Sequence, residues 1–119
     1  METVAKFLST LFNSRDQAHI FHLQTSSYAA HKALNEYYDE IVDIVDGLVE
    51  SYQGKYGIIT NYPHSYHLPK NPPLAYLESL QGFVQEARQS LPQDSELQNE
   101  IDSIATLLNS TCYKLTRLR

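Results

Sequence analysis

Residues 19–50, HIFHLQTSSYAAHKALNEYYDEIVDIVDGLVE, decide the fold that this sequence predicts. Apolar residues recur in this stretch at intervals of three and four, which is the spacing of one face of an α-helix. The polar triplet at residues 25–27 interrupts the pattern and offers a tight turn with an N-cap. We therefore expect one helix over residues 2–24 and a second over residues 28–53 that folds back antiparallel to the first.

Two more helices are predicted in the second half of the chain. Apolar residues share one face from the Pro72–Pro73 pair as far as Pro92, which predicts a helix over residues 74–91. Ser95 and Gln98 have the spacing of a capping box. The fourth helix is therefore expected over residues 95–118.

The connection between the second and third helices is long. Residues 54–73 contain four prolines, two glycines and no helical period. Four amphipathic helices with short, long and short connections predict an all-α fold, a four-helix bundle with one long crossover. With 119 residues in total, the chain is expected to form a single domain, residues 1–119.

The composition argues against several classes of protein. A net charge of -5 and an isoelectric point near 5.4 argue against nucleic-acid binding, because that depends on clustered basic residues. The basic cluster Lys114, Arg117 and Arg119 suits the last turn of a helix. No stretch resembles a signal peptide or a membrane span. Cys112 is the one cysteine, so an intrachain disulfide is excluded and a cytoplasmic location is expected.

Candidate ligands for a metal ion lie along the second predicted helix. At 100° per residue, the polar residues that follow His31 fall within about 120° of it on the border of the apolar face. They are Asn35, Asp39, Asp43, Asp46 and Glu50. A solvated acidic face is one interpretation. The other is a site for divalent iron, manganese or zinc, which bind carboxylates together with imidazoles.

Histidines near the predicted turn add to this pattern. His19 and His22 lie one turn apart, and the short turn after them should bring both close to His31. A hydrogen-bonded core position is the alternative for His22. A second pair, His64 and His67, falls in the long connection and is interpreted as structural or solvent-facing, with a binding pocket under this loop as a third possibility.

The spacing of these residues resembles that of the Dps-type miniferritins, which belong to the ferritin-like superfamily. Those proteins carry a histidine, a second histidine twelve residues later, an acid four residues after that, and Asp and Glu fifteen and nineteen residues after the second histidine. The residues at these positions here are His19, His31, Asn35, Asp46 and Glu50. The run SYAAHKALNEYYDEIVDIVDGLVESYQGKYG is also similar to small, uncharacterised Dps-like proteins encoded by bacteriophages.

In that family the ferroxidase iron lies between two subunits, with the histidines from one chain and the Asp and Glu from its neighbour. The resemblance therefore implies a ferritin-like bundle that forms a homodimer or higher homo-oligomer. It also implies iron or another divalent metal ion bound by His19, His31, Asp46 and Glu50, with Asn35 at a further position of the family pattern. His22 and Asp39 are expected as neighbours of that site from their places on the two helices.

Two functional hypotheses follow from the sequence. The first is a Dps-like metal-binding protein with ferroxidase-like activity at a dimer interface, although the neutral amide of Asn35 is a poorer iron ligand than the acid it replaces. The second is a non-catalytic helical interaction or structural protein, viral in origin, that has lost the metal chemistry and binds a protein partner. In that case the expected location is the cytoplasm of the host.

Overall fold

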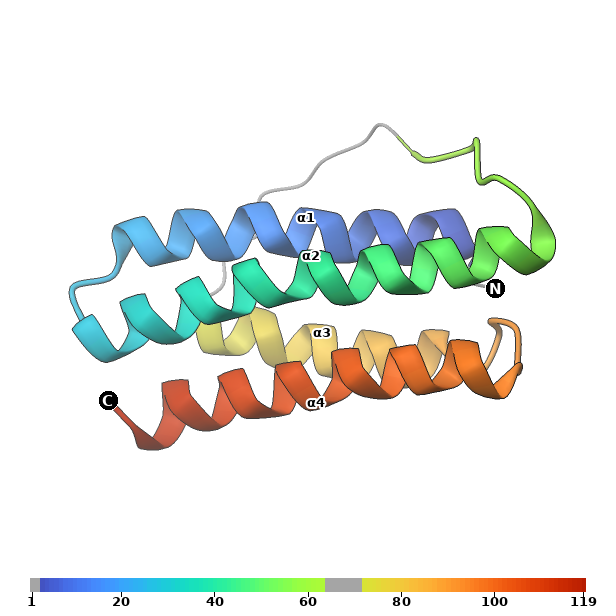
Figure 1. The fold of residues 1–119 in the computed structure, drawn as a ribbon. Helices are drawn as coiled ribbons and strands as arrows, with labels where there is room; N and C mark the ends of the chain where they lie inside the picture. Colours follow the sequence, from blue (N-terminus) through green and yellow to red (C-terminus); the bar gives the residue numbers. More distant parts are fainter. Residues whose placement is uncertain (1–2, 64–71) are drawn as a thin grey trace.

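The computed structural model describes residues 3–63 and 72–119 of the chain. Within them it contains four helices and no strand: α1 is Val4–Gln24, α2 is Tyr28–Tyr56, α3 is Pro73–Ala87 and α4 is Ser95–Arg117 (Figure 1). The prediction of an all-α fold with four helices is therefore confirmed.

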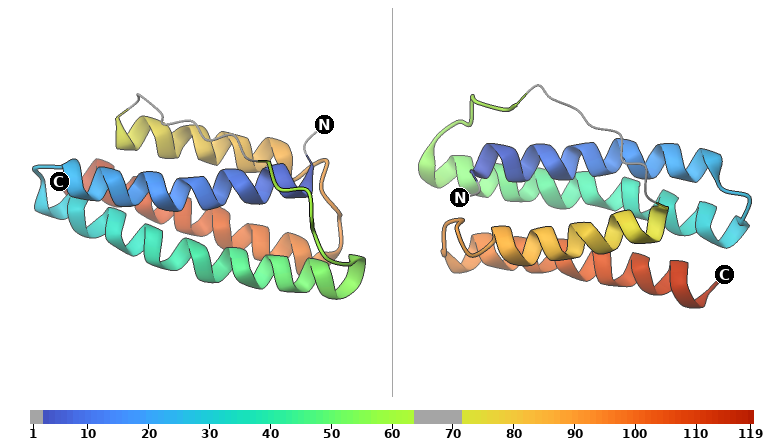
Figure 2. Two further views of the ribbon diagram at one scale, coloured as in Figure 1. Left: turned by 90° about the horizontal axis from the view of Figure 1, so that it is seen from above. Right: turned by 180° about the vertical axis from the view of Figure 1, so that it is seen from behind.

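Neighbouring helices in the bundle run in opposite directions. α1 and α2 form one antiparallel hairpin and α3 and α4 form another, and the hairpins pack with α2 against α4 and α1 against α3 (Figures 1 and 2). α2 and α3 are diagonal to each other and run in the same direction. The chain between them must therefore return from one end of the bundle to the other.

The two ends of the bundle are named here for their turns. The α1–α2 end holds the turn at residues 25–27, the start of α3 and the end of α4. The α3–α4 end holds the turn at residues 88–94, the start of α1 and the end of α2. Each helix thus contributes one terminus to each end.

The first two helices begin where side chains cap them. Thr3 Oγ1 accepts a hydrogen bond from the backbone N–H of Lys6 at 3.2 Å, and Ser27 Oγ accepts one from the backbone N–H of Ala30 at 3.2 Å. The predicted start of the second helix at Tyr28 is confirmed. Each cap satisfies a backbone donor that the first helical turn leaves without a partner.

The second helix continues past its predicted end at residue 53. Gly54 lies inside α2, and the helix ends at Tyr56, followed by Gly57 with a φ of 101°. A single glycine costs a helix only about 1 kcal/mol relative to alanine, so Gly54 does not stop it. α2 ends instead just before Gly57, whose positive φ lies in a region that glycine adopts without strain.

The boundary between α3 and α4 also differs from the prediction. α3 ends at Ala87, four residues before the predicted end at Leu91. Pro92 disfavours helical backbone at Leu91 itself. The predicted capping box of Ser95 and Gln98 is wrong, because Asp94 and not Ser95 is the N-cap residue of α4. The carboxylate of Asp94 accepts a hydrogen bond from the hydroxyl of Tyr56 at 2.7 Å. The side-chain amide of Gln98 donates to the carbonyl oxygens of Arg88 and Pro92.

The core runs along the whole bundle and includes residues from all four helices. The buried residues include Leu34, Ile41, Val45 and Leu48 on the apolar face of α2 and Cys112 on α4.

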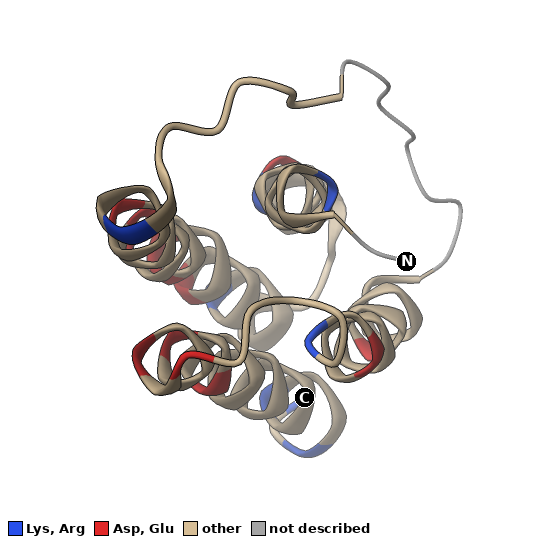
Figure 3. Cartoon of the chain, turned by 90° about the vertical axis from the view of Figure 1, so that its right-hand side faces the viewer, with Lys and Arg blue, Asp and Glu red and all other residues tan. Residues whose placement is uncertain are grey.

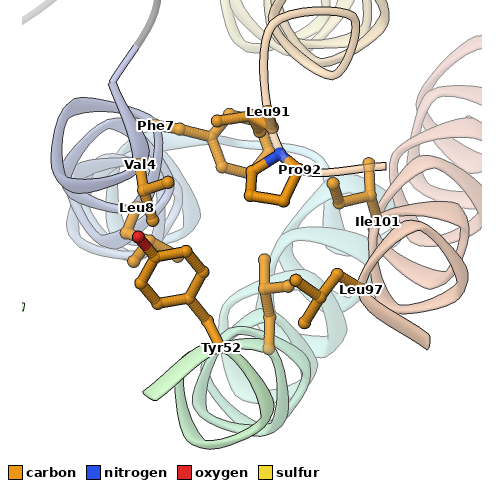
Figure 4. A pocket seen from close by; sticks show the side chains of 9 residues that line it. Val4, Phe7, Leu8, Tyr52, Leu91, Pro92, Leu97 and Ile101 are labelled. Carbon is orange, nitrogen blue, oxygen red and sulfur yellow. The ribbon is translucent and has the colours of Figure 1, made fainter. Parts of the chain in front are cut away.

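At the α3–α4 end the core leaves an apolar cavity of about 20 Å³ (Figure 4). Its lining residues are Val4, Phe7, Leu8, Leu48, Tyr52, Leu91, Pro92, Leu97 and Ile101. A cavity of this size is close to the minimum that holds one water molecule, and apolar walls offer it no hydrogen bond.

The described part of the long connection lies against α1. Ile59 and Tyr62 pack on the core, and the Tyr62 ring centroid is 6.4 Å from that of Phe12. His64 and His67, interpreted from the sequence as structural or solvent-facing, lie outside the described residues. In the part of the chain that the structure covers, no helix has both the length and the hydropathy needed to cross a membrane.

Candidate functional site

Three histidines meet at the α1–α2 end of the bundle. The ring centroids of His19 and His22 are 6.0 Å apart, and those of His22 and His31 are 3.6 Å apart with the rings stacked. The turn at residues 25–27 is short because α2 starts directly after its cap at Ser27. The prediction that this turn would bring the histidines of α1 close to His31 is confirmed for His22, and His19 lies next to His22.

The rings of His22 and His31 bind each other's backbone. Nδ1 of His22 lies 2.7 Å from the carbonyl oxygen of His31, and Nδ1 of His31 lies 2.8 Å from the carbonyl oxygen of His22. A carbonyl oxygen can only accept, so both Nδ1 atoms carry a proton and donate it. In the neutral rings each Nε2 then keeps its lone pair, which is the atom available to a metal ion or another donor.

The sequence left two interpretations of His22 open, a core histidine and a neighbour of the candidate site, and its position is compatible with both. It is buried and hydrogen-bonded, as expected for a core histidine, and it lies in contact with the two histidines of the candidate site. Its hydrogen bond with His31 joins α1 to α2 next to the turn. Part of this histidine cluster consequently holds the hairpin together.

His19 belongs to a chain of contacts that passes through Asn35. Its ring stacks on the ring of Tyr38 with centroids 4.4 Å apart. The hydroxyl of Tyr38 donates to Oδ1 of Asn35 at 2.6 Å, and Nδ2 of Asn35 donates to Asp39 at 3.0 Å. Sequence reasoning missed Tyr38 as part of this site, although its position three residues after Asn35 places the two side chains on neighbouring points of the helix surface.

Asp46 and Glu50 are not brought to the histidines within one chain. They follow His31 by fifteen and nineteen residues in the same straight helix, which places them roughly 22 Å and 28 Å further along its axis. Both are exposed, and neither has a cationic partner among the described residues. Among those same residues, no three His, Cys, Asp or Glu side chains are grouped so that they could hold a metal ion.

A surface hollow of about 330 Å³ opens beside the stacked histidines. It is lined by His22, His31, Tyr28, Lys32, Asn35 and Glu36. The ammonium group of Lys32 lies 5.8 Å from the ring centroid of Tyr28. Glu36 accepts a hydrogen bond from Lys114 at 2.6 Å, and this contact lowers the pKa of its carboxyl group. The hollow thus lies between a cation and a paired carboxylate, with the partly exposed His31 and the buried His22 in its wall.

Comparison with curated proteins and with solved structures gives no match for this chain. One family model does match, and it covers residues 22–115, which include the end of α1 and nearly all of the other three helices. The matched part contains His22, His31, Asn35, Asp46 and Glu50. Since the match extends over well over half of the sequence, the chain belongs to the family described as "Family of unknown function (DUF5856)".

Proposed function

We propose that this chain is a Dps-like, ferritin-like helical bundle that binds a divalent metal ion, iron above all, at the interface between two copies of itself. One copy contributes His19 and His31, with His22 beside them. The other contributes Asp46 and Glu50. Manganese and zinc ions suit the same mixture of imidazole and carboxylate ligands.

The directions of the helices support the bundle type. Each packed pair is antiparallel, and α2 and α3 are parallel and diagonal, so one connection has to pass along the bundle. Ferritin-like folds are four-helix bundles with one such connection. The proposed architecture therefore agrees with the order and direction of the described helices.

The observation that carries the proposal is the pair of reciprocal hydrogen bonds that fixes the rings of His22 and His31. Histidines that ligate metals commonly donate Nδ1–H to a backbone carbonyl, which fixes the tautomer and orients Nε2. His22 and His31 both have this arrangement. No rearrangement of either hydrogen bond is needed before Nε2 accepts a ligand.

The second copy is needed because the histidines and the carboxylates of one chain are too far apart to bind the same ion. The axial separation of Asp46 and Glu50 from His31 exceeds 20 Å by the geometry of the helix, roughly 22 Å and 28 Å. Two α2 helices packed antiparallel would bring the carboxylates of each copy level with the histidines of the other. The exposed position of both acids leaves them accessible to such a partner.

The division of chemical roles follows from these residues. When bound, iron supplies the redox chemistry of ferrous oxidation. The imidazoles supply neutral ligands of fixed orientation, and the carboxylates supply negative charge that offsets the charge of the cation. Asn35 adds no charge, and its amide is already hydrogen-bonded to Tyr38 and Asp39, so we assign it to holding Tyr38 against His19.

Titration calorimetry with zinc, and with ferrous ion under anaerobic conditions, tests this proposal. The informative variant is Asp46→Asn combined with Glu50→Gln, since both side chains are exposed and the amides keep their shape. We expect it to bind metal at least tenfold more weakly than the wild type, the usual effect of losing a ligand or its support.

Glu40→Gln is the matched control. Glu40 is an exposed acid on the same helix, half a turn around from His31 by the 100° step, so its loss should leave binding unchanged. Metal binding that the double variant retains in full would contradict the proposal. So would a wild-type chain that binds neither ion.

A second candidate is a helical interaction or structural protein without metal chemistry, whether viral or cellular. It is favoured by one observation: His22, His31 and Asn35 all make hydrogen bonds to groups of their own chain, which gives each of them a structural role. This candidate predicts a melting temperature that is the same with added zinc, manganese or ferrous ion as with a chelator. It also predicts that the chain purifies from its native source with a different protein.

A further inference from the structure

Exposed apolar side chains gather at the two ends of the bundle. In the described residues, six large hydrophobic side chains are at least half exposed. Leu23, Tyr28, Tyr113 and Leu118 lie at the α1–α2 end, and Tyr56 and Ile58 lie at the α3–α4 end. The sides of the bundle carry none of this set, so the ends are the surfaces that would gain most from being covered.

The two ends differ in charge. At the α1–α2 end, Lys32 and Arg117 form no salt bridge among the described residues, although Lys32 lies near enough to Glu36 to contribute to the lowered pKa of that carboxyl group. Carboxylates collect on α2 and α4 at the α3–α4 end, which faces the viewer in Figure 3, and the basic residues at the end of α4 lie at the back. Glu100 has no cationic partner among the described residues there, and Glu96 has only a 3.5 Å contact with Lys55, which also binds Asp94.

We propose that copies of this chain associate end to end, with the α1–α2 end of one copy on the α3–α4 end of the next. Each end then covers apolar side chains of the other and meets the opposite charge. If the same end of two copies met instead, like charges would lie together. The contact is heterologous, so it builds an open row or a closed ring according to the rotation between copies.

This contact uses other residues than the proposed metal interface. The metal interface uses His19 and His31 of one copy, at the α1–α2 end, with Asp46 and Glu50 of another. The end-to-end contact uses Arg117 and Leu23 on one end and Glu96 and Ile58 on the other. Association through the ends needs no metal ion. It should weaken with salt, because charges on an exposed rim are screened over about 10 Å at 0.1 M ionic strength.

Sedimentation velocity in the presence of a chelator tests the proposal. At about 0.02 M salt the average mass of the wild type should rise with protein concentration, and at about 0.5 M salt this rise should be lost. Arg117→Glu reverses one charge at the α1–α2 end, and Glu96→Lys reverses one charge at the α3–α4 end, so each variant weakens the charge complementarity of the contact. Each variant alone should associate at least tenfold more weakly than the wild type, and an equal mixture of the two should recover association.

Two further variants separate the contact from a general effect of charge or folding. Ile58→Ser removes a side chain that is 78% exposed, so it should weaken association without changing the melting temperature. Glu40→Lys changes the net charge as Glu96→Lys does, but on the side of the bundle, and should associate as the wild type does. A wild type that stays monomeric at low salt would overturn the proposal, as would single variants that associate normally or a mixture that does not recover. Metal binding by calorimetry is expected to be the same in all end variants.

Discussion

Tyr37 carries a hydroxyl group into the centre of the bundle. The side chain is fully buried, and its oxygen lies 2.7 Å from Oγ of Ser14, which is also fully buried. The Ser14 hydroxyl lies 2.6 Å from the carbonyl oxygen of Leu11, which can only accept, so Ser14 donates there and Tyr37 donates to Ser14. Burial raises the pKa of Tyr37, so the ring stays neutral and remains a donor.

Gln17 is a second buried polar residue of α1, and it is less well satisfied. It is 4% exposed, and its Oε1 has no hydrogen-bond partner. A buried acceptor without a partner costs roughly 1 to 3 kcal/mol. We therefore predict that Gln17→Met raises the free energy of unfolding by about 1 kcal/mol in urea titrations. The same substitution at exposed Gln85 should change it by less than about 0.5 kcal/mol, and a destabilised Gln17→Met variant would contradict the assignment.

The thiol of Cys112 should make the free energy of unfolding fall at alkaline pH. Burial raises the pKa of its thiol from an ordinary value of 9.0 to about 11. Between these values the unfolded chain loses the thiol proton and the folded chain keeps it, so the free energy of unfolding falls as pH rises. Below pH 9 this contribution is fully present. Between pH 9 and pH 10, thermal melts of Cys112→Ala should show a shallower fall than the wild type, and equal slopes would contradict the shift.

At the scale of single elements, two glycines near the end of α2 have opposite roles. Gly54 is exposed within the helix, whereas Gly57 has a φ of 101° and ends it. A Cβ atom at either position would meet nothing within 4 Å, so only the backbone conformation differs. Gly57→Ala should therefore lower the free energy of unfolding by about 1 kcal/mol, and Gly54→Ala should raise it by up to about 1 kcal/mol. Chemical denaturation measures both, and shifts of the same sign would contradict this account.

The helices could be predicted from the sequence because their apolar residues recur at helical spacing. Leu77, Leu80, Val84, Ala87 and Leu91 are all buried, as that spacing predicts for the third helix and the residues after it. Some helix ends were less predictable, because side chains from elsewhere in the fold bind there. Asp94, for example, is the N-cap residue of α4 but makes no side-chain capping hydrogen bond, and it binds Lys55 and Tyr56 from α2 instead.

At the scale of the whole molecule, α3 is the helix held by the fewest contacts. It has 15 residues, packs mainly on α4 and touches α1 only slightly. Elements with few buried contacts open at low free energy. We predict that backbone amides of α3 exchange hydrogen with solvent faster than those in the central turns of α1, α2 and α4, as measured by exchange mass spectrometry. Equal protection in all four helices would contradict this order.

The candidate site could be predicted in part. The short turn and the helical period were enough to bring His19, His22 and His31 together, because both act over a few residues. They could not give the reciprocal hydrogen bonds, which depend on the angle at which α1 and α2 cross. Nor could they join Asp46 and Glu50 to the histidines, since a straight helix keeps them apart and a second copy would have to supply the contact.

Metal content and solution mass, measured on the same chromatographic fraction, test the central claim most directly. After incubation with zinc, at about 0.5 M salt to screen contacts between exposed charges, the fraction that contains metal should have the mass of two or more chains. Removing the metal with a chelator should return it to the 13.6 kDa of a single chain. A single chain that holds its metal without a partner, or a protein that takes up no metal at any mass, would contradict a site shared between two copies.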